Sequence, residues 1–243
     1  LAQIYQSHLD VAEKLAAEGA TLAVTYQGET LEGRVRKLAE TLRAPVVAPC
    51  NVTSDEEIGR MFEFVGTELG GLDILVHAIA YADKEALAGM YCAVTRQAFL
   101  QALEIGAYSF TALARGAAPL MEDGGGSMVT LTYFGAEKVV PHYNIMGVTK
   151  AALEASVRYL AADLGPQGIR VNAISAGPVK TLSAKGVRDF SAMLTHASEK
   201  APLKRNITGQ DVGSAGLFLL SELSAGITGE VMHVDAGYNV IGM

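Results

Sequence analysis

Three consecutive stretches decide the fold class of this chain: "GSMVTLTY" (126–133), "YNIMGVTKAALEASVRYLAADL" (143–164) and "GIRVNAIS" (168–175). The first and third are short and largely apolar, which is typical of strands buried on both faces of a parallel sheet. The middle stretch has the length and the composition of a helix. A strand, a helix and a second strand in this order predict two parallel strands joined by a helical crossover.

The same alternation of strand-like and helix-like stretches continues on both sides of this segment. We therefore predict an α/β fold, a single domain over residues 1–243 with a Rossmann-like, doubly wound parallel sheet. Ligands of such sheets lie at the carboxyl ends of the strands. The further helices are expected over 10–20, 31–42, 54–69, 96–120 and 209–221, and the further strands over 21–26, 44–50, 73–80 and 230–236.

The beginning of the chain departs from the usual dinucleotide-binding pattern. Such a sheet opens with a strand, a glycine-rich turn and a helix. Here "LAQIYQSHLD" (1–10) leads into the first helix, and no glycine precedes Gly19. We therefore expect the first strand and the phosphate-binding loop to be absent, as in a truncated chain.

The overall composition excludes several classes of function. A net charge of −7 disfavours nucleic acid as a partner, because phosphate binding needs a basic surface. No run of eighteen apolar residues occurs, so no membrane span is expected. Two cysteines are too few for a disulfide framework or a cysteine-based zinc site, and they suit a reducing cytoplasm. With 50% hydrophobic residues, the surplus apolar surface favours an oligomer.

Tyr143 and Lys150 are the first candidates for a catalytic pair. Seven residues on a helix correspond to about 700° of rotation, so the two side chains should share one face, two turns apart. An ammonium near a phenol lowers the pKa of the phenol, and it can also donate to the ribose hydroxyls of a cofactor. For the pair alone, a core tyrosine and a solvated lysine are an equally good interpretation.

The surrounding sequence resembles the enoyl-acyl-carrier-protein reductases, a branch of the short-chain dehydrogenase/reductase superfamily. Ordinary members of the superfamily use Tyr-x-x-x-Lys, whereas this branch uses Tyr-x6-Lys with a second tyrosine ten residues earlier. Tyr133 stands ten residues before Tyr143 here, and Lys150 stands seven after it. "ISAGPVKT" (174–181) also matches this branch, and the resemblance runs from about Ala12 to Met243.

The resemblance implies NADH-dependent reduction of trans-2-enoyl thioesters on acyl carrier protein in bacterial type II fatty-acid synthesis. It implies that Tyr143 bonds the thioester carbonyl, that Lys150 holds the nicotinamide ribose, and that Tyr133 lines the substrate site. It further implies a homotetramer and a mobile flap over 184–200. Ala82 is implied in substrate binding, and the implied cofactor contacts are Gln27, Asn51, Val52, Ile79, Lys150, Val179, Lys180, Thr181, Leu182 and Ser183.

Cofactor selectivity should depend on the end of the second expected strand of such a sheet. An acidic residue there favours NAD, and a nearby arginine favours NADP. The neutral Gln27 occupies this position, with Arg34 and Arg36 further along, and the resemblance favours NADH over NADPH. Asn51 stands where family members usually carry aspartate, which predicts an altered adenine contact through its amide oxygen.

Two further features of the sequence have structural interpretations. His77 has no ligand partners in the pattern, so we expect a structural histidine and no metal site. "GGGS" (124–127) precedes a strand, and a turn is a better interpretation than a phosphate loop. Two alternatives to an enoyl reductase stay open, a carbonyl (3-ketoacyl) reductase of the same superfamily and a non-catalytic chain of this fold.

Overall fold

The computed structural model describes residues 6–121, 124–179 and 190–242. Its strands in this part of the chain form two parallel sheets. The larger sheet has the order β3-β4-β5-β6, and the smaller one pairs β1 with β2. The strands are β1 (Ala23–Tyr26), β2 (Val46–Pro49), β3 (Ile74–His77), β4 (Gly126–Thr132), β5 (Ile169–Ala176) and β6 (Val231–Val234).

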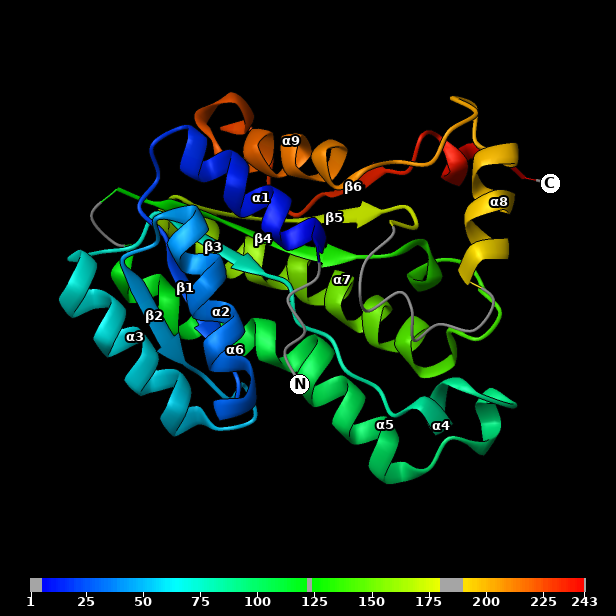
Figure 1. The fold of residues 1–243 in the computed structure, drawn as a ribbon, viewed down its shortest axis with the longest axis horizontal. Coiled ribbons are helices and arrows are strands. Elements are labelled where there is room, and N and C mark those ends of the chain that lie inside the picture. The colour runs from blue at the N-terminus through cyan, green and yellow to red at the C-terminus, as the bar shows by residue number, and fades with distance from the viewer. Residues whose placement is uncertain (1–5, 122–123, 180–189, 243) are drawn as a thin grey trace.

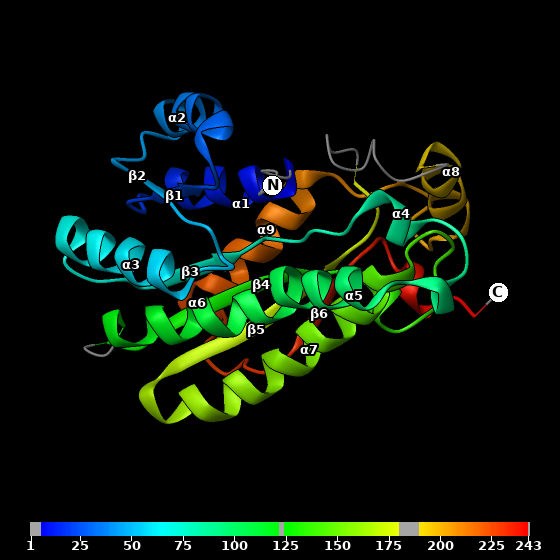
Figure 2. The same ribbon diagram turned by 90° about the horizontal axis from the view of Figure 1, so that it is seen from below.

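Helices cover both faces of these sheets, as Figures 1 and 2 show. One layer contains α1, which packs against α9, and α2, which packs against β1 and β2. The opposite layer contains α3, α5, α6 and α7. The parallel pairing and the two helical layers confirm the predicted α/β fold. The longer helices are α1 (Gln6–Ala17), α2 (Glu29–Leu42), α3 (Asp55–Leu69), α5 (Arg96–Leu103), α6 (Ser109–Ala117), α7 (Asn144–Leu164), α8 (Phe190–Lys200) and α9 (Gly209–Leu220).

Local chemistry explains where several helices begin and end. The side chain of Ser54 accepts a hydrogen bond from the Glu57 amide at the start of α3, and α3 ends at Gly70 with a left-handed φ of 78°. At α9, Thr208 and Asp211 form a reciprocal capping box. Capping residues of this kind can be recognised from the sequence alone.

The single helix expected over 96–120 is interrupted. Residues Glu104–Tyr108 between α5 and α6 are π-helical. Here Gly106 lies against Thr149 of α7 so closely that a Cβ on Gly106 would be 2.5 Å from the Thr149 Cγ2. The interruption is therefore part of the close contact between this segment and α7, and periodicity along one helix could not predict it.

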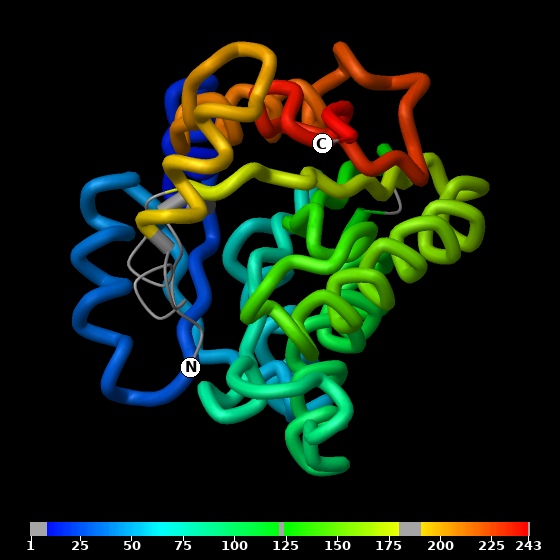
Figure 3. Tube along the Cα trace, turned by 90° about the vertical axis from the view of Figure 1, so that its right-hand side faces the viewer, coloured from blue at the N-terminus to red at the C-terminus, as the bar shows by residue number. Residues whose placement is uncertain are grey.

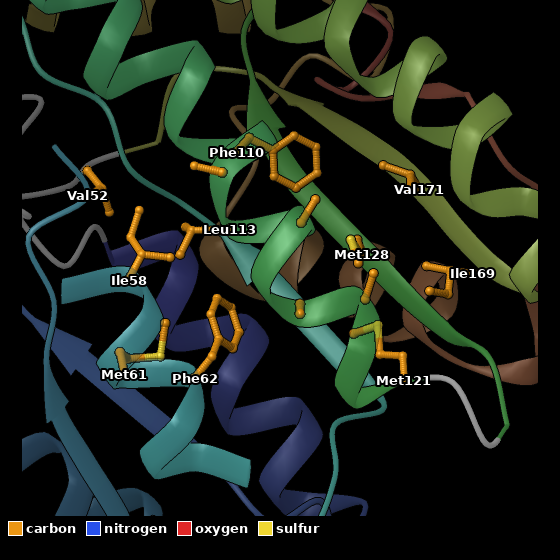
Figure 4. Packing of buried hydrophobic residues seen from close by; sticks show 14 of the residues in the cluster. Val52, Ile58, Met61, Phe62, Phe110, Leu113, Met121, Met128, Ile169 and Val171 are labelled. Atoms are coloured by element: carbon orange, nitrogen blue, oxygen red, sulfur yellow. The ribbon is translucent and has the colours of Figure 1, made fainter. Parts of the chain in front are cut away.

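The main hydrophobic core lies between the larger sheet and the helices of the second layer. Figure 4 shows Met61 and Phe62 of α3 on one side of it and Phe110 and Leu113 of α6 in its centre. Met128 of β4 completes the contact with the sheet and is fully buried. The apolar residues on facing elements hold α3 against α6 and β2, and α6 against β3.

The sheet is divided between β1 and β3. Within the described residues β3 pairs only with β4 and β1 only with β2, and α1 is the first element. An apolar cavity of about 820 Å³ lies between the two sheets, and all of β1 lines it together with Ile74, Leu75 and Val76 of β3.

Candidate active site

The carboxyl end of β4 and one face of α7 bring the two tyrosines and the lysine together. The Nζ of Lys150 donates a hydrogen bond of 2.7 Å to the carbonyl oxygen of Leu131 in β4. The ring of Tyr143 packs edge-on against the ring of Tyr133, with centroids 5.0 Å apart and planes at 74°. Tyr143 and Lys150 therefore both face residues 131–135, although Tyr143 lies one residue before α7 and not on the helix, as the spacing argument assumed.

Two glycines make room for the ring of Tyr143. A Cβ at Gly135 would be 2.5 Å from the Tyr143 Cδ1, and a Cβ at Gly147 would be 2.7 Å from the Gly135 carbonyl oxygen. The two neighbours of Tyr143 in the chain, His142 and Asn144, have left-handed φ values of 63° and 35°. Such strained backbone is retained only where the surrounding structure holds it, and it is common at functional sites.

Burial sets the electrostatics of this region. Burial lowers the pKa of Lys150 to about 8, and the charge of Glu154 opposes this shift. Burial also raises the pKa of Tyr133 to about 12, so this phenol stays protonated at neutral pH. The region thus holds an ammonium that can lose its proton near pH 8 and a phenol that keeps its proton.

The α8 helix contributes to the same end of the molecule. The hydroxyl of Tyr133 donates to the Sδ of Met193 in α8 at 3.6 Å. The ring of His196 in α8 lies 6.0 Å from the ring of Tyr238, and Figure 3 shows the yellow α8 to the left of the red carboxyl-terminal residues. Residues 190–200 of the expected flap are thus helical and contact Tyr133, and the rest of the flap lies outside the described residues.

Three of the predicted cofactor residues meet at the cavity between the sheets. Gln27, Val52 and Ile79 all line it, although they come from three different strand ends. Asn51 is joined to them, because its Oδ1 accepts from the Nε2 of Gln27 at 3.0 Å. The same oxygen also accepts from the backbone amide and hydroxyl of Thr53, at 3.2 and 3.0 Å. The expected acceptor for adenine is therefore already occupied by protein donors.

The remaining predicted positions are dispersed. Ala82 packs beside Ala86, Ala102 and Ile145 near the start of α7. Val179 packs on the second core cluster with Ile174. The predicted cofactor contacts Lys180, Thr181, Leu182 and Ser183 lie outside the described residues.

His77 is a core histidine in this structure. Its Nδ1 bonds the hydroxyl of Thr130 at 2.7 Å, and its Nε2 bonds the hydroxyl of Ser109 at 2.9 Å. Three elements are joined through this buried ring. No group of histidine, cysteine and acidic side chains that could hold a metal ion is found in the described part of the chain.

A match to a family model identifies the chain. The model described as "Enoyl-(Acyl carrier protein) reductase" matches residues 9–239. The chain belongs to this family. Its membership of the enoyl-(acyl carrier protein) reductase family, its Rossmann-like fold and its predicted class of enzyme are thereby confirmed.

Individual relatives of this enoyl-(acyl carrier protein) reductase agree. The "Enoyl-[acyl-carrier-protein] reductase [NADH] 1" of Rhizobium meliloti is 53% identical over 233 residues, which are 96% of this chain and 85% of that protein. The corresponding Bacillus cereus protein is 51% identical over 234 residues, which are 96% of this chain and 91% of that protein.

Solved structures of the family have the same fold. The Anaplasma phagocytophilum reductase in complex with NAD has a TM-score of 0.94 and 50% identity, over 100% of this chain and 90% of that one. The Bacillus cereus reductase with NADP+ and an indole naphthyridinone has a TM-score of 0.96 and 49% identity, over 100% and 95%. Among the helices described here, none has the length and apolar character that a membrane span requires.

Sequence reasoning missed two buried polar residues of this enoyl-(acyl carrier protein) reductase. Glu154 lies one turn after Lys150 on α7, and the hydroxyl of Thr132 donates to its Oε1 at 2.7 Å. A carboxylate four residues after the lysine was a visible signal. That it is buried, and that a strand residue holds it, only the packing of α7 on β4 could show.

Proposed function

We propose that Tyr143 and Lys150 form the reducing site of an NADH-dependent enoyl-thioester reductase that acts on acyl carrier protein-bound substrates of bacterial type II fatty-acid synthesis. The observation that carries the proposal is their meeting on residues 131–135, beside Tyr133. When bound, NADH supplies a hydride to the β-carbon of the substrate. Tyr143 stabilises and protonates the enolate oxygen, and Lys150 donates to the nicotinamide ribose.

The wide spacing of the pair suits this reaction. A carbonyl reductase protonates the oxygen on the same carbon that accepts the hydride. In an enoyl thioester, charge develops on an oxygen two carbons away from the β-carbon. A phenol at the start of α7, seven residues before the ribose-binding lysine, can be aimed at that displaced oxygen, as an oxyanion-hole donor is. The protonated hydroxyl of Tyr133 lines the substrate side of the site.

The residues at the other end of the site suit the adenosine half of NADH. Gln27, Val52 and Ile79 give a mostly apolar lining with one amide. NADPH differs from NADH by a 2′-phosphate, which a nearby arginine would have to bind. Arg36 is engaged by Glu32 at 2.7 Å, which supports NADH over NADPH. Val179, Lys180, Thr181, Leu182 and Ser183 are proposed to contact the nicotinamide and pyrophosphate, and Ala82 the substrate.

One spectrophotometric assay tests the proposed reaction. NADH absorbance is followed with a trans-2-enoyl thioester and, separately, with a 3-ketoacyl thioester. We expect oxidation of NADH with the enoyl substrate only. Oxidation with the ketoacyl substrate alone would identify a carbonyl reductase. Oxidation with neither would favour a non-catalytic chain of this fold.

We further propose a cytoplasmic homotetramer in which residues 1–243 form one domain. Contacts between α1 and α9 from opposite ends of the chain support the single domain. Exposed apolar side chains support the tetramer, since Leu100 on α5, Tyr159 on α7 and Val240 near the carboxyl end are 58%, 76% and 71% exposed. Light scattering should give about four times the chain mass of 25.5 kDa. Free Cys50 and Cys92 suit a reducing compartment.

A further inference from the structure

Glu154 is a buried carboxylate that the proposed reaction does not by itself require. It lies on α7 with only 8% of its surface exposed. Burial is costly for a carboxylate unless hydrogen bonds or nearby positive charge compensate it, and burial raises the pKa of Glu154. The groups around Glu154 must therefore compensate for the burial of its carboxylate.

Thr132 is the polar partner that holds the carboxylate. Its hydroxyl donates to the Glu154 Oε1 at 2.7 Å, and Thr132 is only 4% exposed. This hydrogen bond favours the ionised form of Glu154 and lowers its pKa. Because Thr132 lies between Leu131, which bonds Lys150, and Tyr133, which packs on Tyr143, the bond joins Glu154 to the strand that carries the site.

Lys150 occupies the same face of α7 one turn earlier. Residues four apart on a helix are neighbours, so Glu154 and Lys150 share one face of α7, although no ion pair of 4.0 Å or less joins these two described residues. Lys150 is 7% exposed, and its Nζ is fixed on the carbonyl of Leu131. Burial lowers the pKa of this ammonium to about 8, and the negative charge of Glu154 acts in the opposite direction.

Other charged groups around Glu154 partly offset one another. Glu137 lies nearby and disfavours the ionised form of Glu154, whereas His233 and Arg158 favour it. The Nε2 of His233 and the Oε1 of Glu137 lie 2.8 Å apart, so these two groups contact each other as well. Thr132 is the group among these whose direct hydrogen bond to the carboxylate fixes its position.

We propose that Glu154 is a positioning residue for the reduction: held by Thr132 one turn after Lys150 on α7, its carboxylate stabilises the ammonium form of Lys150. The inference rests on the proposed role of Lys150. Glu154 acts through Lys150 and touches neither substrate nor cofactor. Loss of its charge should leave the reaction intact wherever Lys150 is protonated anyway.

The test is the pH profile of Glu154→Gln, since glutamine keeps the size of the side chain and can still accept from Thr132. We expect the alkaline limb of kcat/KM to move down by about one pH unit. That shift corresponds to a loss of about fivefold at pH 8 and less than twofold at pH 6. Thr132→Val should shift the limb in the same direction by a smaller amount, because the carboxylate loses its donor.

Asp163→Asn is the matched control, an acid-to-amide change at an exposed position of the same helix. Its alkaline limb should coincide with that of the unchanged protein. Coincidence of the Glu154→Gln limb with that of the unchanged protein would overturn the proposal. So would a uniform loss of activity at every pH, which is the result of a structural role.

A second measurement keeps this inference separate from the proposed function. The pKa of Lys150 can be followed by NMR of lysines labelled with ¹³C at Cε, with Lys150→Met to assign the signal. Glu154→Gln should lower this pKa even if the protein oxidises no NADH with an enoyl thioester. An unchanged lysine pKa overturns the role of Glu154, whereas absent oxidation in the unchanged protein overturns the proposed reaction.

Discussion

Tyr143 is the residue on which the proposed chemistry depends most directly. Left-handed neighbours on both sides and the close approach of Gly135 fix its ring against Tyr133. A side chain held in this way needs little reorganisation when charge develops on the substrate oxygen, and preorganisation of this kind is a main source of catalytic rate. The strain in residues 142–144 is thus compatible with a functional role.

Replacing Tyr143 with Phe should lower kcat by about 10²-fold, the usual effect of losing one oxyanion-stabilising donor. The phenyl ring still packs on Tyr133, so NADH binding measured by fluorescence should change little. Tyr159→Phe is the control, because Tyr159 lies on the same helix and is 76% exposed. If kcat of Tyr143→Phe matched that of the control, the assigned role of the phenol would be wrong.

The lowered pKa of Lys150 predicts that activity falls above about pH 8. Its ammonium form is the active one, and burial lowers its pKa to about 8, so kcat/KM should fall about tenfold per pH unit above that value. The unfolded chain, whose lysines titrate near 10.5, binds more protons than the folded one between these values. The contribution of Lys150 to the free energy of unfolding therefore rises with pH in this window. Constant kcat/KM up to pH 9.5, under conditions where circular dichroism shows a folded protein, would contradict the assignment.

At the scale of elements, the site depends on how closely α7 approaches the segment after β4. Residues 134–136 form a short 3₁₀ turn under the first turn of α7, and Gly135 and Gly147 allow backbone and ring to touch. The contact between α7 and the π-helical segment 104–108 fixes α7 from the other side. Small displacements of α7 would therefore move Tyr143 and Lys150 together.

Gly135→Ala tests this contact. The added methyl would meet the Tyr143 Cδ1 at 2.5 Å, so the ring has to move, and overpacking of this kind costs about 1–3 kcal/mol of stability. We expect a lower melting temperature and a lower kcat. Gly165→Ala is the control, because a Cβ at Gly165 meets no atom within 4 Å. A Gly135→Ala protein with the kcat and melting temperature of this control would show that the close approach is unimportant.

At the scale of the whole molecule, the strands of the two sheets differ in how many partner strands they have among the described residues. β4 is paired on both sides, by β3 and β5, over most of its length. The pairings described for β3 and β1 leave one edge of each facing the apolar cavity. Backbone amides without a partner strand open more easily, so local stability should differ between the centre and the divide.

Hydrogen exchange followed by mass spectrometry can measure this difference. Peptides that cover 127–132 should exchange slowest, and peptides that cover 23–26 and 74–77 should exchange faster, because among the described residues β1 and β3 are each paired on one side only. The adjacent helices α6 and α9 serve as internal references for fully packed elements. Equally slow exchange in 74–77 and 127–132 would mean that the divide is closed in solution.

Much of this arrangement follows from local sequence signals. Apolar runs and their helical spacers predict the parallel sheet and the order of its elements, because hydrophobic periodicity acts within each segment. Ser54 and Gly70 bound α3 for reasons that local chemistry contains. The spacing of Tyr143 and Lys150 predicts that they share one helical face, but Tyr143 precedes α7, so the conformation of residues 142–144 also decides where its ring lies. The resemblance carried by Tyr133, Tyr143 and Lys150 indicates the family.

Only the tertiary structure decided the environment of these residues. The π-helical turn at 104–108, the burial of Glu154 and its bond to Thr132 arise from contacts between elements far apart in the chain. The occupation of the Asn51 oxygen by Gln27 and Thr53 likewise depends on neighbouring strand ends. Sequence specifies which groups an element presents, but the pKa of a lysine or the partners of an amide depend on what packs against that element, and packing is a property of the assembled fold.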